Sequence, residues 1–251
     1  MGIGKPGSSF IHLPKAIIVD LDDTLITYTA AGEAAWHAVC THHAASMAVG
    51  MDAERLYRGI ADARHDYWKD PERHRQGRLN LLAARRELVA MALESLGCGN
   101  RDKAEAIADE YSALQYEWLE WFPGAEKTLE ALCKDRMRLV LATNGQTLLQ
   151  RAKINRFHLE RFFQHILVEE EMGFGKPDPR VYQKALGLLG LPASEVWMVG
   201  DNLQWDVKGA QDAGLKGIWV DFQGTGLPVG SDTIPDRIIK SFSCLQGSTI
   251  H

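Results

Sequence analysis

The sequence predicts an α/β fold built on a parallel sheet, and two patterns support this. Between residues 122 and 221, short apolar runs alternate with segments of helical periodicity, which is typical of repeated βα units. The apolar runs lack polar alternation, as expected of parallel strands buried on both faces. Three of the runs end at Val19, Ala142 and Val199, and polar residues follow each of them. We therefore expect a Rossmann-like sheet whose strand ends bring these polar residues to one edge.

Five strands and four helices can be placed in this core from the sequence. The predicted strands are 16–20, 138–142, 164–168, 196–200 and 217–221, and 237–240 is a candidate for a short edge strand. The predicted helices lie near 125–134, 147–157, 179–189 and 206–213. Asp178 followed by Pro179 is a typical start for the third helix, because Asp caps and Pro fits the first turn.

A helical segment interrupts the core soon after its first strand. Residues 29–121 have almost no β-branched runs, and Asn80 and Gly97 bracket one helix as its expected cap and stop. We expect a catalytic core of 15–28 and 122–245, an all-helical cap domain of 29–121, and a flexible leader of 1–14. The insertion follows the first carboxylate cluster, so it is placed to cover the strand ends as a lid.

Composition excludes several classes of function. The chain has 251 residues, and its net charge of −5 provides no overall basic surface for a nucleic-acid polymer. No apolar run is long enough to span a membrane, and residues 1–14 lack the apolar centre of a signal peptide. The four cysteines are scattered without a C-x-x-C pair, which favours a reduced, cytoplasmic protein. The expected partner is a small molecule, while the oligomeric state cannot be read from the sequence.

The first polar cluster contains two carboxylates, Asp20 and Asp22, at the end of the first strand. Residues two apart on a strand face the same side, so the two carboxylates would repel each other unless a proton or a divalent cation intervenes. The pattern favours Asp20 as a nucleophile and Asp22 as a general acid and base. Alone, it would also fit two solvated turn residues.

The remaining clusters supply groups suited to a phosphate and a metal ion. Thr143, Asn144 and Gly145 offer a hydroxyl and backbone N–H groups near a helix start, which could form a phosphate cradle or a simple cap. Lys176 could neutralise both Asp20 and a phosphate, although most lysines are surface residues. Asp201 and Asp206 add oxygen ligands at a strand end, which suits Mg²⁺.

These four clusters together resemble the haloacid dehalogenase superfamily in its phosphatase branch. The motifs Asp-x-Asp-x-Thr, Thr, Lys-Pro and Gly-Asp-x4-Asp occur here in the family's order, over nearly the whole chain. The short sequences around Thr143, Lys176 and Asp201 resemble those of the pyrimidine nucleotidases and N-acylneuraminate-9-phosphatases. The resemblance implies strand order 3-2-1-4-5 and a helical cap of the type inserted after the first motif. Asp23 stands where many members of the family have glycine.

The resemblance also implies roles for the motif residues. Asp20 would attack phosphorus to form an aspartyl-phosphate, Asp22 would protonate the leaving alcohol and activate water, and Thr143 and Lys176 would bind the phosphoryl group. Asn144 and Gly145 would complete the substrate cradle. Mg²⁺ would be held by Asp20, Asp201 and the backbone carbonyl of Asp22, with Asp206 in support. The expected activity is Mg²⁺-dependent hydrolysis of a small phosphorylated metabolite, such as a nucleotide or sugar phosphate.

Three alternatives remain open at the level of sequence. A phosphosugar mutase would keep all four motifs and differ only in the cap. A 2-haloacid dehalogenase is disfavoured by Asp22, because a departing halide needs no proton. A non-catalytic protein that binds a phosphorylated metabolite as a regulator is disfavoured because no catalytic position is missing. Between residues 55 and 86 the cap has nine Lys/Arg against four Asp/Glu, which could attract an anion or simply be a solvated helical surface.

Overall fold

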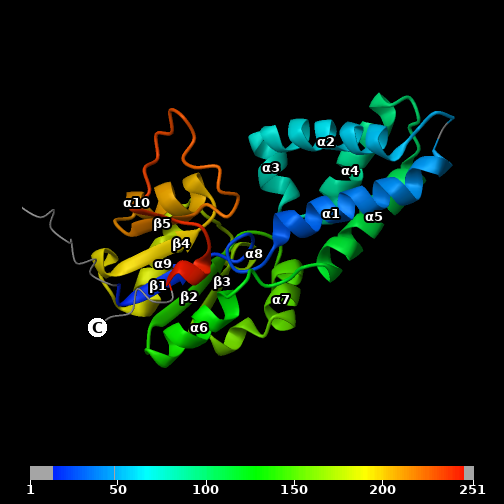
Figure 1. Cartoon of the computed structure of the whole chain (residues 1–251). Coiled ribbons are helices and arrows are strands. Elements are labelled where there is room, and N and C mark those ends of the chain that lie inside the picture. Colours follow the sequence, from blue (N-terminus) through cyan, green and yellow to red (C-terminus); the bar gives the residue numbers. More distant parts are fainter. Residues whose placement is uncertain (1–13, 48, 246–251) are drawn as a thin grey trace, which may run out of the picture.

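A computed structural model of the protein describes residues 14–47 and 49–245. Of the predicted leader, only Pro14 lies within the described residues. A wholly parallel sheet of six strands, in the order β3-β2-β1-β4-β5-β6, forms the centre of the core (Figure 1). The strands are β1 (Ala16–Val19), β2 (Arg138–Thr143), β3 (His165–Val168), β4 (Val196–Gly200), β5 (Lys216–Val220) and β6 (Arg237–Ile239). The fold class and the order 3-2-1-4-5 are confirmed, and β6 is the candidate edge strand.

The centre of the sheet is buried on both faces, as expected from the apolar sequences of β1 and β4. In β1, Ile17 and Val19 join one hydrophobic cluster, whereas Ala16 and Ile18 join the cluster on the opposite face. Helices contribute to both clusters. The first face is covered by α6 (Ala125–Lys134) and α7 (Thr147–Arg156), and the second by α9 (Pro179–Leu189) and α10 (Gly209–Asp212).

In the core, the start of α9 follows the sequence-based prediction, whereas the helical segment after β4 differs from it. Asp178 accepts a hydrogen bond of 3.0 Å from the Arg180 N–H at the start of α9, as expected. The last helical segment begins earlier than predicted, with a π-helical turn over Leu203–Lys208 that leads into α10. Asn202, rather than Asp206, caps this turn. Asp206 therefore lies inside the segment, where its side chain contacts the strand ends.

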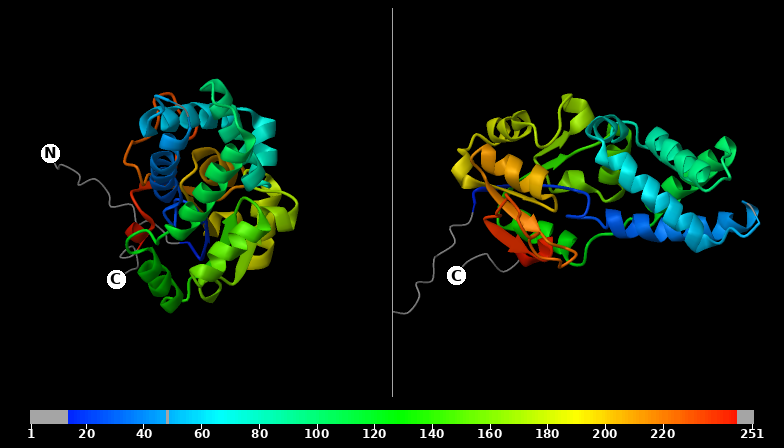
Figure 2. Two further views of the ribbon diagram at one scale, coloured as in Figure 1. Left: turned by 90° about the vertical axis from the view of Figure 1, so that its right-hand side faces the viewer. Right: turned by 90° about the horizontal axis from the view of Figure 1, so that it is seen from above.

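Five α-helices follow one another between β1 and α6, and four of them pack around a hydrophobic cluster of their own. The five are α1 (Tyr28–His43), α2 (Ala53–Lys69), α3 (Pro71–Gly77), α4 (Leu81–Ser95) and α5 (Arg101–Glu117), and all but α3 contribute to that cluster. Figure 2 shows them beside the sheet rather than wrapped around it. Asn80 does precede α4, but its side chain makes no capping hydrogen bond, so the expected cap is wrong in that detail. Gly97, with φ of 73°, follows the helix end as predicted.

Two connections join these helices to the core, and they run side by side. Ile26 and Trp121 form an antiparallel bridge. The Thr27 N–H donates to the Glu120 carbonyl at 2.9 Å, and the Phe122 N–H donates to the Leu25 carbonyl at 2.9 Å. This pairing lies next to the predicted boundaries at 28/29 and 121/122, although the division into core and cap domains itself stays a prediction. Among the described helices, none is long and apolar enough to cross a membrane.

Candidate active site

All the site residues that were predicted from the sequence line one pocket of about 360 Å³. It lies between the carboxyl ends of the strands and helices α1 to α5. The predicted residues come from four stretches of chain that are far apart in sequence. The predicted residues that line it are Asp20, Asp22, Thr143, Asn144, Gly145, Lys176, Asp201 and Asp206.

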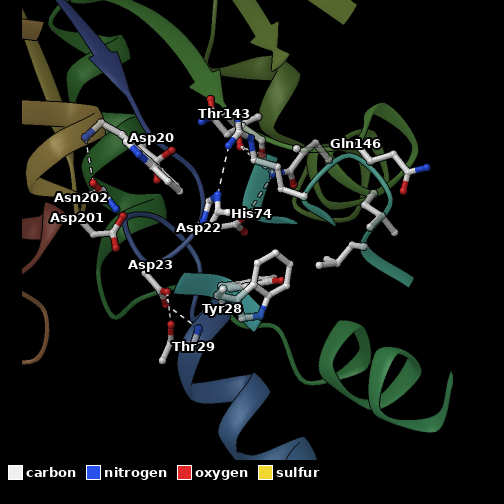
Figure 3. Close-up of a pocket in the computed structure, with 18 of the residues that line it drawn as sticks. Asp20, Asp22, Asp23, Tyr28, Thr29, His74, Thr143, Gln146, Asp201 and Asn202 are labelled. Carbon is white, nitrogen blue, oxygen red and sulfur yellow. Dashed lines mark hydrogen bonds between the residues drawn. The ribbon is translucent and has the colours of Figure 1, made fainter. Parts of the chain in front are cut away.

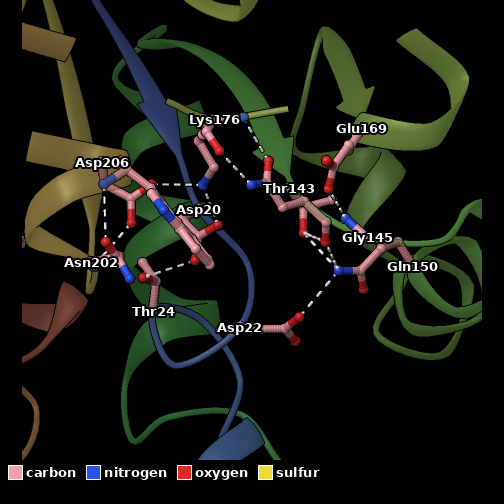
Figure 4. A network of polar contacts seen from close by, with 12 residues as sticks. Asp20, Asp22, Thr24, Thr143, Gly145, Gln150, Glu169, Lys176, Asn202 and Asp206 are labelled. Atoms are coloured by element: carbon pink, nitrogen blue, oxygen red, sulfur yellow. Dashed lines mark hydrogen bonds and ion pairs between the residues drawn. The ribbon is translucent and has the colours of Figure 1, made fainter. Parts of the chain in front are cut away.

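Lys176 links the ends of β1 and β4 at the floor of this pocket. Its Nζ lies 2.5 Å from Asp20 Oδ1 and 2.6 Å from Asp206 Oδ1, and only 2% of the residue is exposed (Figure 4). Burial disfavours the charged lysine, but the two adjacent carboxylates outweigh it and raise the pKa of Lys176. Lys176 is therefore a fixed positive charge beside Asp20, and not the surface lysine that its residue type alone would suggest.

Three carboxylates meet here at metal-ligand spacing. One oxygen from each of Asp20, Asp201 and Asp206 lies within 4.8 Å of the other two. Burial raises the pKa of Asp20 to about 7, which Lys176 opposes and Asp206 reinforces. Burial, followed by repulsion from Asp20 and Asp206, also raises the pKa of Asp201. In their ionised forms the three side chains would carry three negative charges against the single positive charge of Lys176, and this all-oxygen set fits Mg²⁺.

The close packing of this cluster depends on a glycine at the end of β4. A Cβ added to Gly200 would lie 2.3 Å from the carboxyl carbon of Asp206, so no larger residue fits there. Asp206 Oδ2 accepts the Asn202 N–H at 3.0 Å, which holds the carboxylate against the backbone. The Gly-Asp sequence at 200–201 therefore makes room for Asp206 to reach Lys176.

Asp22 faces the same pocket but is held by a separate set of partners. Lys153 Nζ lies 2.8 Å and 2.7 Å from its two carboxylate oxygens, and Gln150 Nε2 donates to it at 3.1 Å. The Asp22 carboxylate is not part of the three-carboxylate cluster. The predicted metal contact of Asp22 therefore rests on its backbone carbonyl alone and stays a prediction.

The backbone and contacts of Asp23 explain how aspartate can take the place of the glycine that many similar proteins have at this position. Its φ is 58°, in the left-handed region that glycine adopts most easily and that Asp tolerates better than most residues. Its carboxylate accepts the Thr29 N–H at 2.8 Å and also the Thr29 hydroxyl, as Figure 3 shows. Burial raises the pKa of Asp23 to about 6. Asp23 thus connects the loop after β1 to the first turn of α1.

Residues 143–145, at the end of β2 and just after it, partly differ from the expected phosphate cradle. Gln150 Nε2 donates to Thr143 Oγ1 at 3.0 Å, which positions the hydroxyl at the pocket. The Asn144 side chain bonds both backbone polar groups of Lys176, at 2.7 Å and 2.8 Å. The Gly145 N–H donates to Glu169 Oε2 at 2.8 Å (Figure 4), so this amide is not free as the sequence pattern suggested.

Helix α3 and the residues after it contact the core at the pocket rim. Arg78 Nε lies 2.8 Å from Glu169 Oε1 and 2.9 Å from Glu169 Oε2, and the Glu169 side chain is only 4% exposed. The His74 ring packs against the Trp205 ring at a centroid distance of 5.2 Å. Trp205 therefore does touch the inserted helices.

Four pocket residues were not identified from the sequence, namely Gln150, Lys153, Arg78 and Arg85, and neither was Glu169, which contacts Gly145 and Arg78 beside the pocket. Gln150 and Lys153 lie three apart on α7, so their common helix face was a usable signal. Arg78 and Glu169 are 91 residues apart, and no local pattern connects them.

The family model for haloacid dehalogenase-like hydrolases matches residues 14–214. The chain belongs to this family. It is 29% identical over 208 residues to a glyceraldehyde 3-phosphate phosphatase from Pyrococcus abyssi, a match that covers 83% of this chain and 82% of the relative. It is 32% identical over 146 residues to an N-acylneuraminate-9-phosphatase from Rattus norvegicus, covering 58% of each chain. The predicted resemblance to the phosphatase branch is therefore confirmed.

The fold is also similar to that of a 2-haloacid dehalogenase from Pseudomonas syringae. That structure superposes with a TM-score of 0.61 at 29% identity, over 94% of this chain and 98% of the dehalogenase. The shared fold alone therefore does not separate phosphate-ester hydrolysis from dehalogenation, and the side chains of the pocket must decide between them.

Proposed function

We propose that the protein is a Mg²⁺-dependent phosphomonoester hydrolase that acts on a small phosphorylated metabolite through an aspartyl-phosphate. The observation that carries this proposal is the separate environment of two carboxylates in one pocket. Asp20 lies against Lys176 in the metal-ligand cluster, whereas Asp22 is held by Lys153 and Gln150 outside it. Two carboxylates with different surroundings suit two different roles, one as nucleophile and the other as acid and base.

The first half-reaction assigns a role to each of these groups. A carboxylate oxygen of Asp20 attacks phosphorus, and the P–O bond to the alcohol breaks as Asp22 donates a proton to the departing oxygen. The Thr143 hydroxyl and the Lys176 ammonium bind the phosphoryl oxygens and balance their charge. Asp20, Asp201 and the backbone carbonyl of Asp22, with Asp206 in support, would hold Mg²⁺, which would supply further positive charge at the phosphoryl group.

The second half-reaction restores the enzyme. Asp22, now a carboxylate, takes a proton from a water molecule that attacks phosphorus, and the bond between phosphorus and Asp20 breaks to release inorganic phosphate. Lys153 and Gln150 orient Asp22 toward the pocket in both halves. The similar phosphatases act on compounds named as glyceraldehyde 3-phosphate and N-acylneuraminate 9-phosphate, which supports a small substrate. A pocket of about 360 Å³ is at the small end of ligand sites.

Asp22 favours hydrolysis over dehalogenation, because a departing alkoxide needs a proton and a halide does not. A phosphosugar mutase would use the same core residues and return the phosphoryl group to the sugar. A cytoplasmic location, expected from the cysteine pattern, stays a prediction.

Phosphate release from a panel of small phosphate esters, with Mg²⁺ or with EDTA, tests the proposal directly. We expect Mg²⁺-dependent turnover, no halide release from 2-chloropropionate, and a phosphoenzyme that hydroxylamine cleaves. Asp20→Asn should lose turnover, whereas Asp135→Asn, an exposed aspartate away from the pocket, should not. Phosphate release by Asp20→Asn at more than a few per cent of the parent rate would exclude Asp20 as the nucleophile. Transfer between sugar positions without net phosphate release would favour the mutase.

A further inference from the structure

We infer that the substrate carries a second anionic group, a carboxylate or a second phosphate, which Arg85 of α4 binds on the helical side of the pocket. This inference rests on the proposed phosphatase function, because it concerns the part of the substrate that is not the transferred phosphoryl group. It is carried by the charge balance of the side chains that line the pocket.

Five lysine and arginine side chains line this pocket, and four of them pair with a carboxylate of the protein. The pairs are Lys176 with Asp20 and Asp206, Lys153 with Asp22, Arg78 with Glu169, and Arg64 with Glu33. Arg85 is the exception, since it forms no ion pair with any carboxylate of residues 14–47 and 49–245. The pocket therefore contains one cation whose charge the described protein does not balance.

Arg85 is also buried, which makes the missing counter-ion costly. It is 8% exposed, and its hydrogen-bond partners are all neutral. Nη1 donates to the Ser112 hydroxyl at 3.0 Å, and Nη2 donates to the Tyr28 hydroxyl at 3.1 Å and to the side-chain carbonyl of Gln115. These contacts orient the guanidinium but leave its charge in place. Buried arginines are normally paired with an anion, so a ligand anion is the natural counter-charge.

The same wall of the pocket contains a hydrogen-bond donor that has no acceptor among the described residues. The Arg85 guanidinium lies 4.7 Å from the centre of the Tyr111 ring, and Trp36 stacks on that ring at 3.6 Å. The indole N–H of Trp36 is buried and donates to no acceptor among the described residues. A ligand group rich in acceptor oxygens would suit this wall, whereas an apolar or cationic group would not.

Arg85 is placed to reach the far end of a substrate whose phosphoryl group lies at Asp20. Tyr28 connects the two regions, because its hydroxyl accepts from Arg85 and its ring faces Lys153 at 4.4 Å, which in turn binds Asp22. Figure 3 shows Tyr28 across the pocket from Thr143. A short chain that ends in two anionic groups would place one at Asp20 and the other at Arg85.

Matched pairs of phosphate esters test this inference without requiring the natural substrate. The carboxylate arm compares phosphoglycolate with ethylene glycol monophosphate, and the phosphate arm compares 1,3-propanediol bisphosphate with its monophosphate. We expect the parent enzyme to prefer the anionic tail in at least one arm by about 10- to 100-fold in kcat/KM, the usual gain from a buried charge-assisted contact. The arm with the larger ratio identifies the second anion.

Substitution of Arg85 should remove this preference. Arg85→Gln should bring the ratio of kcat/KM values close to one, and Arg85→Lys should give an intermediate ratio because it keeps the charge without the planar fork. Arg86→Gln is the matched control: Arg86 is the next residue of α4, but it pairs with Asp109 outside the pocket, so this variant should keep the parent ratio.

The outcomes separate the inference from the proposed function. If no ester releases phosphate, the proposed function fails. If all esters are hydrolysed but the parent shows no preference in either arm, or Arg85→Gln keeps the preference, the inference is wrong. If Arg85→Gln does not fold, the parent ratios and the ratio of Arg85→Lys decide in the same way.

Discussion

Replacing Lys176 with methionine would test whether charge balance holds the site together. Lys176 is buried between Asp20 and Asp206, with N–O distances of 2.5 and 2.6 Å. Its removal leaves a cluster of buried carboxylates that repel one another without a counter-charge. Breaking a buried ion pair by removing one partner costs about 3–5 kcal/mol, so Lys176→Met should lower the free energy of unfolding by that amount at pH 7.5.

This cost should depend on pH and on Mg²⁺. The pKa of Asp20 is already raised to about 7, and without Lys176 it should rise further, so at pH 5 protonation relieves much of the repulsion. The loss measured by urea unfolding in EDTA should therefore be clearly smaller at pH 5 than at pH 7.5. Mg²⁺ should recover part of the loss at pH 7.5, because it binds the same carboxylates.

The matched control is Lys184→Met, which removes an exposed lysine from α9. It should change stability by less than about 0.5 kcal/mol at either pH. A loss below about 1 kcal/mol for Lys176→Met at pH 7.5, or an equal loss at both pH values, would refute the charge-balance reasoning.

Three further predictions follow from the same contacts. Asp22→Asn should nearly stop hydrolysis of alkyl phosphates but spare phosphorylation by nitrophenyl phosphate, whose leaving group needs no proton; equal losses for both esters would leave Asp22 only a structural role. Because the pKa of Asp20 is raised from 3.8 to about 7, the folded metal-free protein keeps a proton that the unfolded chain releases, and stability should fall as pH rises from about 4 to 7. The gain in melting temperature on adding Mg²⁺ should then be larger at pH 7.5 than at pH 5, and a gain independent of pH would contradict this. Arg78→Met should lower the free energy of unfolding in urea by about 1–3 kcal/mol, because it leaves the buried Glu169 carboxylate without its cation. Arg75→Met removes one partner of an exposed ion pair and should lower it little. Equal effects would mean that the Arg78–Glu169 contact is not buried in solution.

The sequence by itself determined the sheet and the place of the carboxylates that we propose to be catalytic. Strands buried on both faces must be apolar throughout, so runs such as 16–19 and 196–200 are visible without a structure. The polar residues that follow them, including Asp20 and Asp201, then meet at one edge because all the strands run parallel. Helix α9 was equally predictable, since Asp178 and Pro179 satisfy its first turn locally.

Only the tertiary structure decided which charges face one another. Lys153 and Asp22 are 131 residues apart, and Arg78 and Glu169 are 91 apart, so no periodicity or spacing relates them. The Gly145 amide is likewise occupied by a carboxylate from another strand end, which the local pattern of a helix start could not reveal. Arg85 differs from its neighbour Arg86 only in the direction it faces, yet one is buried without a carboxylate and the other is paired with Asp109. Electrostatic partnership depends on distance and burial in space, and a linear sequence records neither.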